Sequence, residues 1–121
     1  MYEKKPLVRH RETQSLDCPF GHVQRIVTGG DGGIANVHVV KITKGTPHLH
    51  QGYDEVYYVL AGTGTIILGQ ETYPLRPGSV AVIPAGVMHS LEASEGEELE
   101  FVIFGTPPMS IDDERARPRK V

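Results

Sequence analysis

Two short segments of the chain carry histidine and glutamate at spacings that suit metal binding. In the first, one residue separates His48 from His50, and Glu55 follows five positions later. Residues i and i+2 of an extended chain share a face, so both imidazoles point to one side, and a turn at Gly52 lets the next strand return the Glu55 carboxylate to the same place. In the second segment a Pro-x-Gly turn directs His89 onto a further strand. Three imidazoles and one carboxylate are a suitable ligand set for a divalent transition metal.

A His-x-His pair on its own would be weak evidence, because two polar residues often share the solvent-facing side of a strand. Glu55 at this offset and the block from Gly78 to His89 change the balance in favour of a metal site.

The elements that must position these ligands are predicted to be short strands. The chain holds 14 Gly and 9 Pro, which separate blocks rich in β-branched and aromatic residues, and no segment shows a sustained helical stripe. Blocks of this length and spacing are typical of an all-β sandwich or barrel. Gly69-Gln70 is a two-residue hairpin signal between two of them. The predicted strands span residues 23–28, 34–43, 55–60, 63–68, 72–75, 79–83, 89–92 and 98–104.

Length and charge exclude several classes of function. A chain of 121 residues is one domain by the usual size of domains, and its net charge of -3 argues against a nucleic-acid groove or a polybasic membrane patch. No apolar run approaches the roughly 18 residues of a membrane span, and the first residues lack the apolar stretch of a secretion signal. Cys18 is the one cysteine, which fits a reducing cytoplasm.

The two segments together resemble the motifs of the cupins. The first cupin motif is G-x5-H-x-H-x3-4-E-x6-G, and the second is G-x5-P-x-G-x2-H-x3-N. The matching residues are His48, His50, Glu55 and Gly62 in the first motif and Gly78, Pro84, Gly86 and His89 in the second. Ile42 stands where the first motif has its leading glycine, and Ala93 stands where the second often has asparagine. Neither departure falls on a ligand.

The resemblance implies a single cupin domain over residues 1–121, an all-β, double-stranded β-helix (jelly-roll) barrel with little helix. The barrel core is expected at about 20–106, with flexible or packing tails at 1–16 and 107–121. In that family the four matched side chains are the metal ligands, and the matched glycines and proline form the turns that fix the register of the barrel. The implied ligands are His48, His50, Glu55 and His89.

The implied cofactor is one divalent transition metal, Fe, Mn, Ni, Co or Zn. Four protein ligands leave one or two coordination positions open, and one carboxylate leaves a net charge of about +1, which favours small anionic ligands. We therefore expect a metal-dependent enzyme acting on a small anionic or polyol metabolite, either a dioxygenase or a sugar isomerase or lyase. The alternative is a non-catalytic barrel that binds a small molecule for sensing or storage.

Other residues near the motifs are weaker candidates. Tyr57 shares the parity of Glu55 and is a candidate catalytic hydroxyl, although a core aromatic with its hydroxyl hydrogen-bonded is the more common reading. His38 is a second catalytic candidate, for which an exposed strand position is the expectation. Gln51, Tyr53 and Met88 flank the ligands and are expected to line the mouth of a substrate pocket.

The parity of the strand that carries Glu55 also predicts an assembly. Val56, Tyr58 and Leu60 alternate with the inward positions, so they face outward and form an apolar surface. A barrel of this size with such a surface is expected to form a homodimer.

Overall fold

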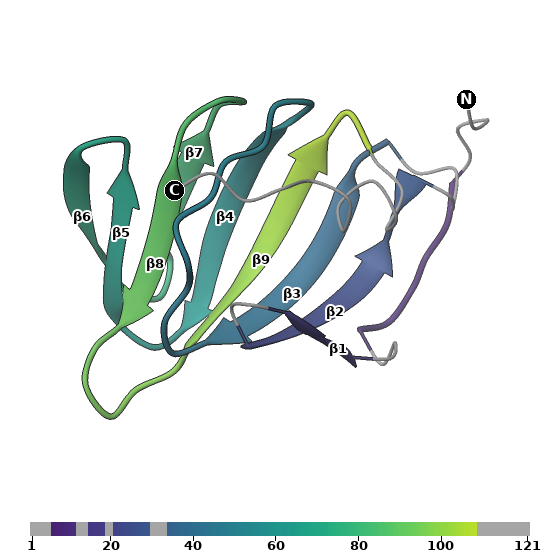
Figure 1. Cartoon of the computed structure of the whole chain (residues 1–121). Helices are drawn as coiled ribbons and strands as arrows, with labels where there is room; N and C mark the ends of the chain where they lie inside the picture. The colour runs from purple at the N-terminus through teal and green to yellow at the C-terminus, as the bar shows by residue number, and fades with distance from the viewer. Residues whose placement is uncertain (1–5, 12–14, 19–20, 30–33, 109–121) are drawn as a thin grey trace.

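Strands make up nearly all the regular structure of the protein. The computed structural model describes residues 6–11, 15–18, 21–29 and 34–108, and within them it contains nine β-strands and no α-helix (Figure 1). The strands are β1 (Ser15–Cys18), β2 (Gly21–Val27), β3 (Asn36–Ile42), β4 (Asp54–Ala61), β5 (Gly64–Leu68), β6 (Glu71–Leu75), β7 (Val80–Ile83), β8 (His89–Ala93) and β9 (Leu99–Thr106).

The strands form two antiparallel sheets. The larger sheet has the order β1-β2-β3-β9-β4-β7, and the smaller has the order β6-β5-β8. In Figure 1 the small sheet lies on the left and the large sheet extends to the right. The last strand, β9, lies between β3 and β4 and so joins segments far apart in the sequence. This confirms the predicted all-β jelly-roll barrel.

The core lies between the sheets and follows the alternation of the strands. In β4, Glu55, Tyr57 and Val59 are buried, whereas Tyr58 and Leu60 are 44% and 40% exposed, which matches the predicted parity. Both sheets contribute to one apolar cluster, whose members are Val23, Val40, Ile42, Tyr57, Val59, Ile66, Leu75, Ala81, Ile83, Leu91, Leu99 and Phe101. The inward face of β4 therefore carries core residues and Glu55 on the same surface.

Two of the turns between strands contain a glycine with a positive φ. Gly69 and Gln70 form the turn between β5 and β6, as predicted, and Gly69 has a φ of 63°. Gly62 follows β4 with a φ of 86°, and a Cβ built there would lie 2.2 Å from the carbonyl oxygen of Glu98. A side chain at position 62 would thus displace the neighbouring backbone.

The segment before β2 contacts the outside of the large sheet. Residues 6–11 are held there by Arg11, whose guanidinium donates to Gln24 and lies 2.7 Å from the Glu100 carboxylate. β1 begins at Ser15, so a strand overlaps the end of the expected N-terminal tail. Most of the expected C-terminal tail, residues 109–121, lies outside the described residues.

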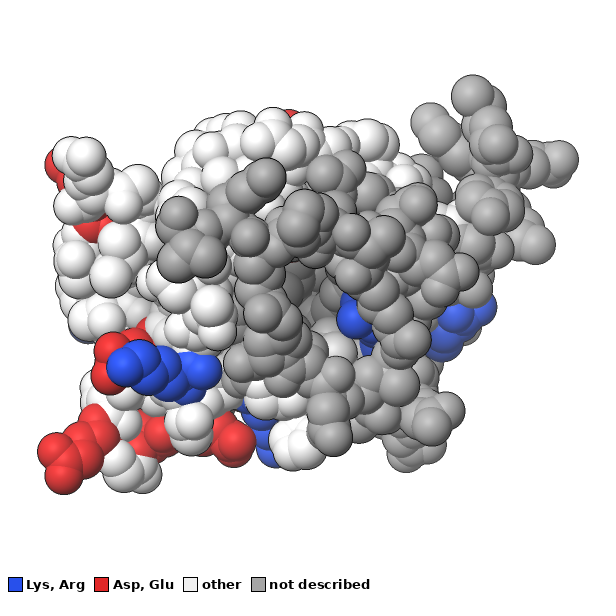
Figure 2. Space-filling view, in the orientation of Figure 1, with Lys and Arg blue, Asp and Glu red and all other residues white. Residues whose placement is uncertain are grey.

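Acidic side chains gather at one end of the molecule. Glu95, Glu97 and Glu98 are exposed in and around the turn between β8 and β9, and Figure 2 shows acidic atoms at the corresponding lower left end. Their carboxylates therefore form a solvated surface. Among the described residues, no helix is long and apolar enough to cross a membrane.

Candidate metal centre

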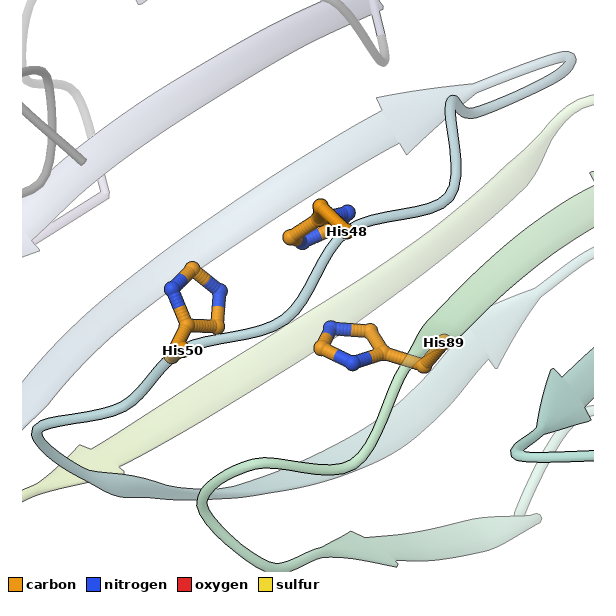
Figure 3. Close-up of side chains that lie close together, drawn as sticks. All are labelled: His48, His50 and His89. Carbon is orange, nitrogen blue, oxygen red and sulfur yellow. The ribbon is translucent and has the colours of Figure 1, made fainter. Parts of the chain in front are cut away.

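Three histidines from two segments of the chain converge on one point. His48 and His50 lie in the connection between β3 and β4, and His89 is the first residue of β8. Figure 3 shows their rings directed toward a common centre. One ring nitrogen from each lies within 4.8 Å of those of the other two. The three side chains are positioned to bind one metal ion.

A backbone bridge brings the two segments together. The amide of His48 donates to the carbonyl of His89 at 3.0 Å, and the amide of His89 donates to the carbonyl of His48 at 2.8 Å. The amide of Gly86 also donates to the carbonyl of His50 at 2.7 Å. The turn at Pro84-Ala85-Gly86 is thereby fixed against the first histidine segment, which sets the position of His89.

Carbonyl oxygens fix the orientation of two of the rings. Nδ1 of His48 lies 3.0 Å from the carbonyl oxygen of Thr46, and Nδ1 of His89 lies 2.9 Å from that of Val87. A carbonyl only accepts hydrogen bonds, so each Nδ1 carries a proton, and in the neutral ring Nε2 keeps its lone pair. This is the tautomer that binds a metal through Nε2, with the second nitrogen held by a backbone acceptor.

Glu55 adjoins the histidines from the inward face of β4. Its Oε1 lies 3.4 Å from Nε2 of His50 and 3.5 Å from Nε2 of His89, and the hydroxyl of Tyr57 donates to the same oxygen at 3.2 Å. Burial alone would raise the pKa of Glu55, but the His89 imidazole 3.5 Å away and the positive charges that His50, His89 and His48 carry when they are protonated outweigh burial and hold the pKa below its usual value. The carboxyl group is therefore ionised at neutral pH.

His48 is neutral under the same conditions. Burial, with a smaller contribution from the neighbouring His89, lowers its pKa to about 4, so the ring carries no proton on Nε2 at pH 7. A neutral imidazole beside an ionised carboxylate is the protonation state that metal binding requires.

The donor set fits a divalent transition metal. Nε2 of His89 is buried and makes no hydrogen bond among the described residues, because the Glu55 oxygen 3.5 Å away is an acceptor, like the unprotonated nitrogen; buried polar atoms are almost always paired. A metal at the common centre would supply that partner. Imidazole nitrogens together with a carboxylate oxygen suit Fe, Mn, Ni, Co or Zn.

The expectation that His38 is an exposed strand residue was wrong. His38 is 4% exposed, because it lies on the inward face of β3 with β2 on one side and β9 on the other. Its pKa is lowered to about 4, mainly by burial and then by the charge of Arg25, while the charge of Glu55 acts in the opposite direction. The ring is neutral at pH 7 and lies within the electrostatic reach of the site.

The three residues expected at a pocket mouth differ in how deeply they are buried. Tyr53 is 3% exposed, its ring stacks on that of His50 with centroids 4.6 Å apart, and its hydroxyl lies 2.8 Å from Nδ1 of His50. It thus packs behind a histidine of the site. Gln51 is exposed and Met88 is half-buried, and their role in a pocket stays a prediction.

Arg25 is a neighbour of His38 that the sequence motifs do not reveal. It lies directly opposite His38 in the pairing of β2 with β3. Arg25 and Val23 lie two residues apart in the predicted strand 23–28, so they share a face of it. An inward Val23, which the structure places in the core, could therefore have indicated an inward Arg25.

Comparison with known proteins places this site in a family. The family described as "Cupin domain" matches residues 36–105, which include all three histidines and Glu55. The chain belongs to this family.

Two relatives that have functional names are similar over part of the chain. An L-ectoine synthase of Vibrio campbellii is 32% identical over 76 residues, 60% of this chain and 59% of the relative. An oxalate-binding protein of Thermotoga maritima is 34% identical over 55 residues, 46% of each chain. The chain therefore matches about half to three fifths of the length of these curated relatives.

A solved structure matches over more of the chain. The crystal structure of a protein from Planctomyces limnophilus has a TM-score of 0.76 and 31% identity, with 89% of this chain and 94% of that chain covered. The similarity covers most of both chains, so the two proteins share the same fold.

Proposed function

We propose that the protein is a metal-dependent enzyme acting on a small anionic or polyol metabolite. The proposed ligands of one divalent transition metal are His48, His50, Glu55 and His89. The observation that carries the proposal is the arrangement of the three imidazoles, with Nε2 of His89 buried and lacking a hydrogen-bond partner among the described residues. The bound ion would supply Lewis-acid or redox chemistry at that point.

The charge of the site favours an anionic substrate. A divalent ion and the single ionised carboxylate of Glu55 together leave a net charge of about +1 in a buried setting. Four protein ligands would leave one or two positions for water or substrate. A carboxylate, hydroxy-acid or enediolate is the chemical class that such a centre binds best.

Tyr57 is the proposed catalytic or positioning residue of the chain. Its hydroxyl donates to Oε1 of Glu55 at 3.2 Å, and its side chain is 3% exposed. A hydroxyl held against a ligand carboxylate orients that carboxylate and is also a proton source next to the reacting position. The relative named L-ectoine synthase supports an enzyme of this fold.

The second candidate function is binding without catalysis, as the relative named oxalate-binding protein suggests. In that case the same centre would hold a small anion for sensing or storage. Oxygen chemistry by a dioxygenase and Lewis-acid chemistry by a sugar isomerase or lyase are the two reaction types within the first candidate.

One set of assays separates these possibilities. The protein, purified without a His tag, is loaded with Fe(II) without oxygen, and oxygen uptake is then followed with catechols, diketones and thiols. Protein loaded with Mn(II) or Zn(II) is assayed on sugar phosphates and hydroxy-acids, and calorimetry with oxalate measures binding. Turnover that His89→Ala abolishes supports an enzyme, whereas 1:1 oxalate binding without any turnover supports the alternative. If the protein shows no turnover and no oxalate binding, both candidate functions are wrong.

We further propose that two chains associate into a homodimer and that the protein works in the cytoplasm. The outward face of β4, β7 and β9 is apolar, and Val80, Val82 and Phe104 on it are 59%, 62% and 44% exposed. An apolar patch over neighbouring strands is typical of a self-complementary interface. The single cysteine, Cys18, supports a reducing compartment.

A further inference from the structure

The side chain of Asp54 connects the start of β4 to the turn that leads to His89. The amide of Ala85 donates to Oδ1 of Asp54 at 2.8 Å, between residues 31 positions apart in the chain. Asp54 is exposed, whereas Glu55 beside it is buried, because neighbouring residues of a strand point to opposite faces. The Asp54 carboxylate therefore lies outside the ligand group and holds the backbone of the turn.

This contact begins where the pairing of β4 with β7 ends. The last pair of the ladder is Glu55 with Ile83, so the residue that follows opposite Asp54 is Pro84. Proline has no amide N–H and cannot extend the ladder. The Asp54 side chain instead accepts from the next amide along the chain, that of Ala85. It thereby continues the connection between the two segments beyond the last pair of the sheet.

The turn that Asp54 holds directly precedes the His89 ligand. The amide of Val87 donates to the carbonyl of Pro84 at 3.2 Å, and Gly86 has a φ of 87°, as the third residue of a type II turn does. The carbonyl oxygen of Val87 lies 2.9 Å from Nδ1 of His89. A displacement of the turn would therefore reach the His89 ring both through the backbone and through this carbonyl.

The segment that carries His50 holds the same turn at a second point. The amide of Gly86 donates to the carbonyl of His50 at 2.7 Å, and Asp54 follows His50 by four positions. In Figure 3 the connection that carries His50 runs beside the turn that leads to His89. A backbone carbonyl and the Asp54 carboxylate thus fix the turn against the segment that supplies the other ligands.

We infer that Asp54 is a positioning residue of the metal centre, because its carboxylate fixes the turn at 84–86 and thereby the place of His89. The inference rests on the proposed function, since it concerns the same centre. A ligand that is already oriented loses less conformational freedom when the metal binds, so losing such a contact weakens metal binding without removing a ligand. A hydrogen bond from an amide to a carboxylate suits this role because it is charge-assisted.

The test compares the Zn(II) affinities of untagged proteins, measured by competition with a chromophoric chelator at a temperature at which each protein is fully folded. Asp54→Ala removes the acceptor and should bind Zn(II) about tenfold more weakly than wild type. Asp54→Asn loses the charge but keeps a side-chain oxygen that accepts from Ala85, so its affinity should stay within about threefold of wild type.

Glu97→Ala is the matched control. The exposed Glu97 carboxylate accepts from the amide of Thr63 at 3.1 Å, between residues 34 positions apart, and Glu97 follows the end of β8 that lies away from His89. Its removal should leave Zn(II) affinity equal to that of wild type. If Glu97→Ala weakens binding as much as Asp54→Ala does, the effect reflects a general loss of structure and the inference is wrong.

The Asp54 variants separate the hydrogen bond from the charge. If Asp54→Asn binds Zn(II) as weakly as Asp54→Ala, the negative charge near the ion accounts for the effect, and the inference is wrong. An affinity of Asp54→Ala equal to that of wild type would also overturn it. Each of these results overturns the inference alone, whereas wild type that binds no Zn(II) would contradict the proposed centre itself.

A second variant removes the same hydrogen bond from the donor side. If Asp54→Ala fails to fold, as a thermal melt would show, Ala85→Pro takes its place, because it removes the amide and keeps the carboxylate. Proline is favoured at the second position of a type II turn, which is the position of Ala85. Ala85→Pro should bind Zn(II) about tenfold more weakly than wild type. An affinity equal to that of wild type would overturn the inference.

Discussion

The hydroxyl of Tyr53 lies 2.8 Å from Nδ1 of His50, and the two rings stack with an angle of 27° between their planes. His50 thereby differs from His48 and His89, whose Nδ1 atoms contact backbone carbonyls. All three rings are thus held at Nδ1 while their Nε2 atoms face the centre. Such supporting contacts fix the orientation of a ligand ring before a metal arrives.

Removing the Tyr53 hydroxyl should weaken metal binding. Tyr53→Phe keeps the stacked ring and loses only the contact with Nδ1 of His50, so we expect metal affinity to fall about tenfold, at the lower end for such supporting contacts. Competition with a chromophoric chelator measures the affinity. Tyr58→Phe, at an exposed position of β4, is the control. Equal affinity in Tyr53→Phe and wild type would show that the hydroxyl does not support the ligand.

The metal-free protein should lose stability as the pH falls from about 6.5 to 4. His38 and His48 have pKa values of about 4 in the folded chain and 6.5 when unfolded, so in this range the unfolded chain binds more protons. Each group should lower the free energy of unfolding by about 3 kcal/mol across the interval. Urea unfolding at pH 7 and pH 4 measures the loss. His38→Gln should make this loss of unfolding free energy smaller by the contribution of one histidine. A loss equal to that of wild type would contradict the low pKa of His38.

Two glycines with similar backbone angles should differ in their tolerance of alanine. Both Gly62 and Gly69 have positive φ, which costs an alanine about 1 kcal/mol, but only Gly62 approaches another backbone atom closely. Gly62→Ala should therefore lower the free energy of unfolding by about 3 kcal/mol or more, and Gly69→Ala by about 1 kcal/mol. Chemical denaturation of both variants is the measurement. Equal losses would mean that the backbone at Gly62 moves away from the Glu98 carbonyl without further cost.

The apolar outer face should hold the proposed dimer together. Val82→Glu places a charge on that face, next to Val56 in the pairing of β7 with β4, and should halve the mass measured by light scattering. Val8→Glu adds the same charge at a fully exposed site in the segment 6–11 and should leave the mass unchanged. A wild-type chain that is monomeric at micromolar concentration would contradict the proposal.

Much of the fold could be predicted from local patterns. The alternation in β4 placed Tyr57 inside and Tyr58 outside, and Gly69-Gln70 marked the hairpin, because both signals depend only on neighbouring residues. The spacing of the histidines predicted the group that the structure brings together, since the turn at Gly86 fixes where His89 begins its strand.

The surroundings of the site could not be predicted in the same way. His38 is buried because β2 and β9 flank β3 and its inward face meets the core, and the pairing of β3 with β9 joins segments about sixty residues apart. Arg25 lies opposite His38 in the pairing of β2 with β3. The position of Tyr53 behind His50 likewise depends on how the chain turns between β3 and β4. Each of these is a non-local contact.

The most direct test of the central claim is the metal content of protein expressed without a His tag and dialysed before elemental analysis. Wild type should hold about one transition-metal ion per chain, while His48→Ala and His89→Ala should each hold far less, because both remove an imidazole of the converging group. His22→Ala, at an exposed position of β2, should match wild type. Metal content in the His48 and His89 variants equal to that of wild type would contradict the assignment of the centre.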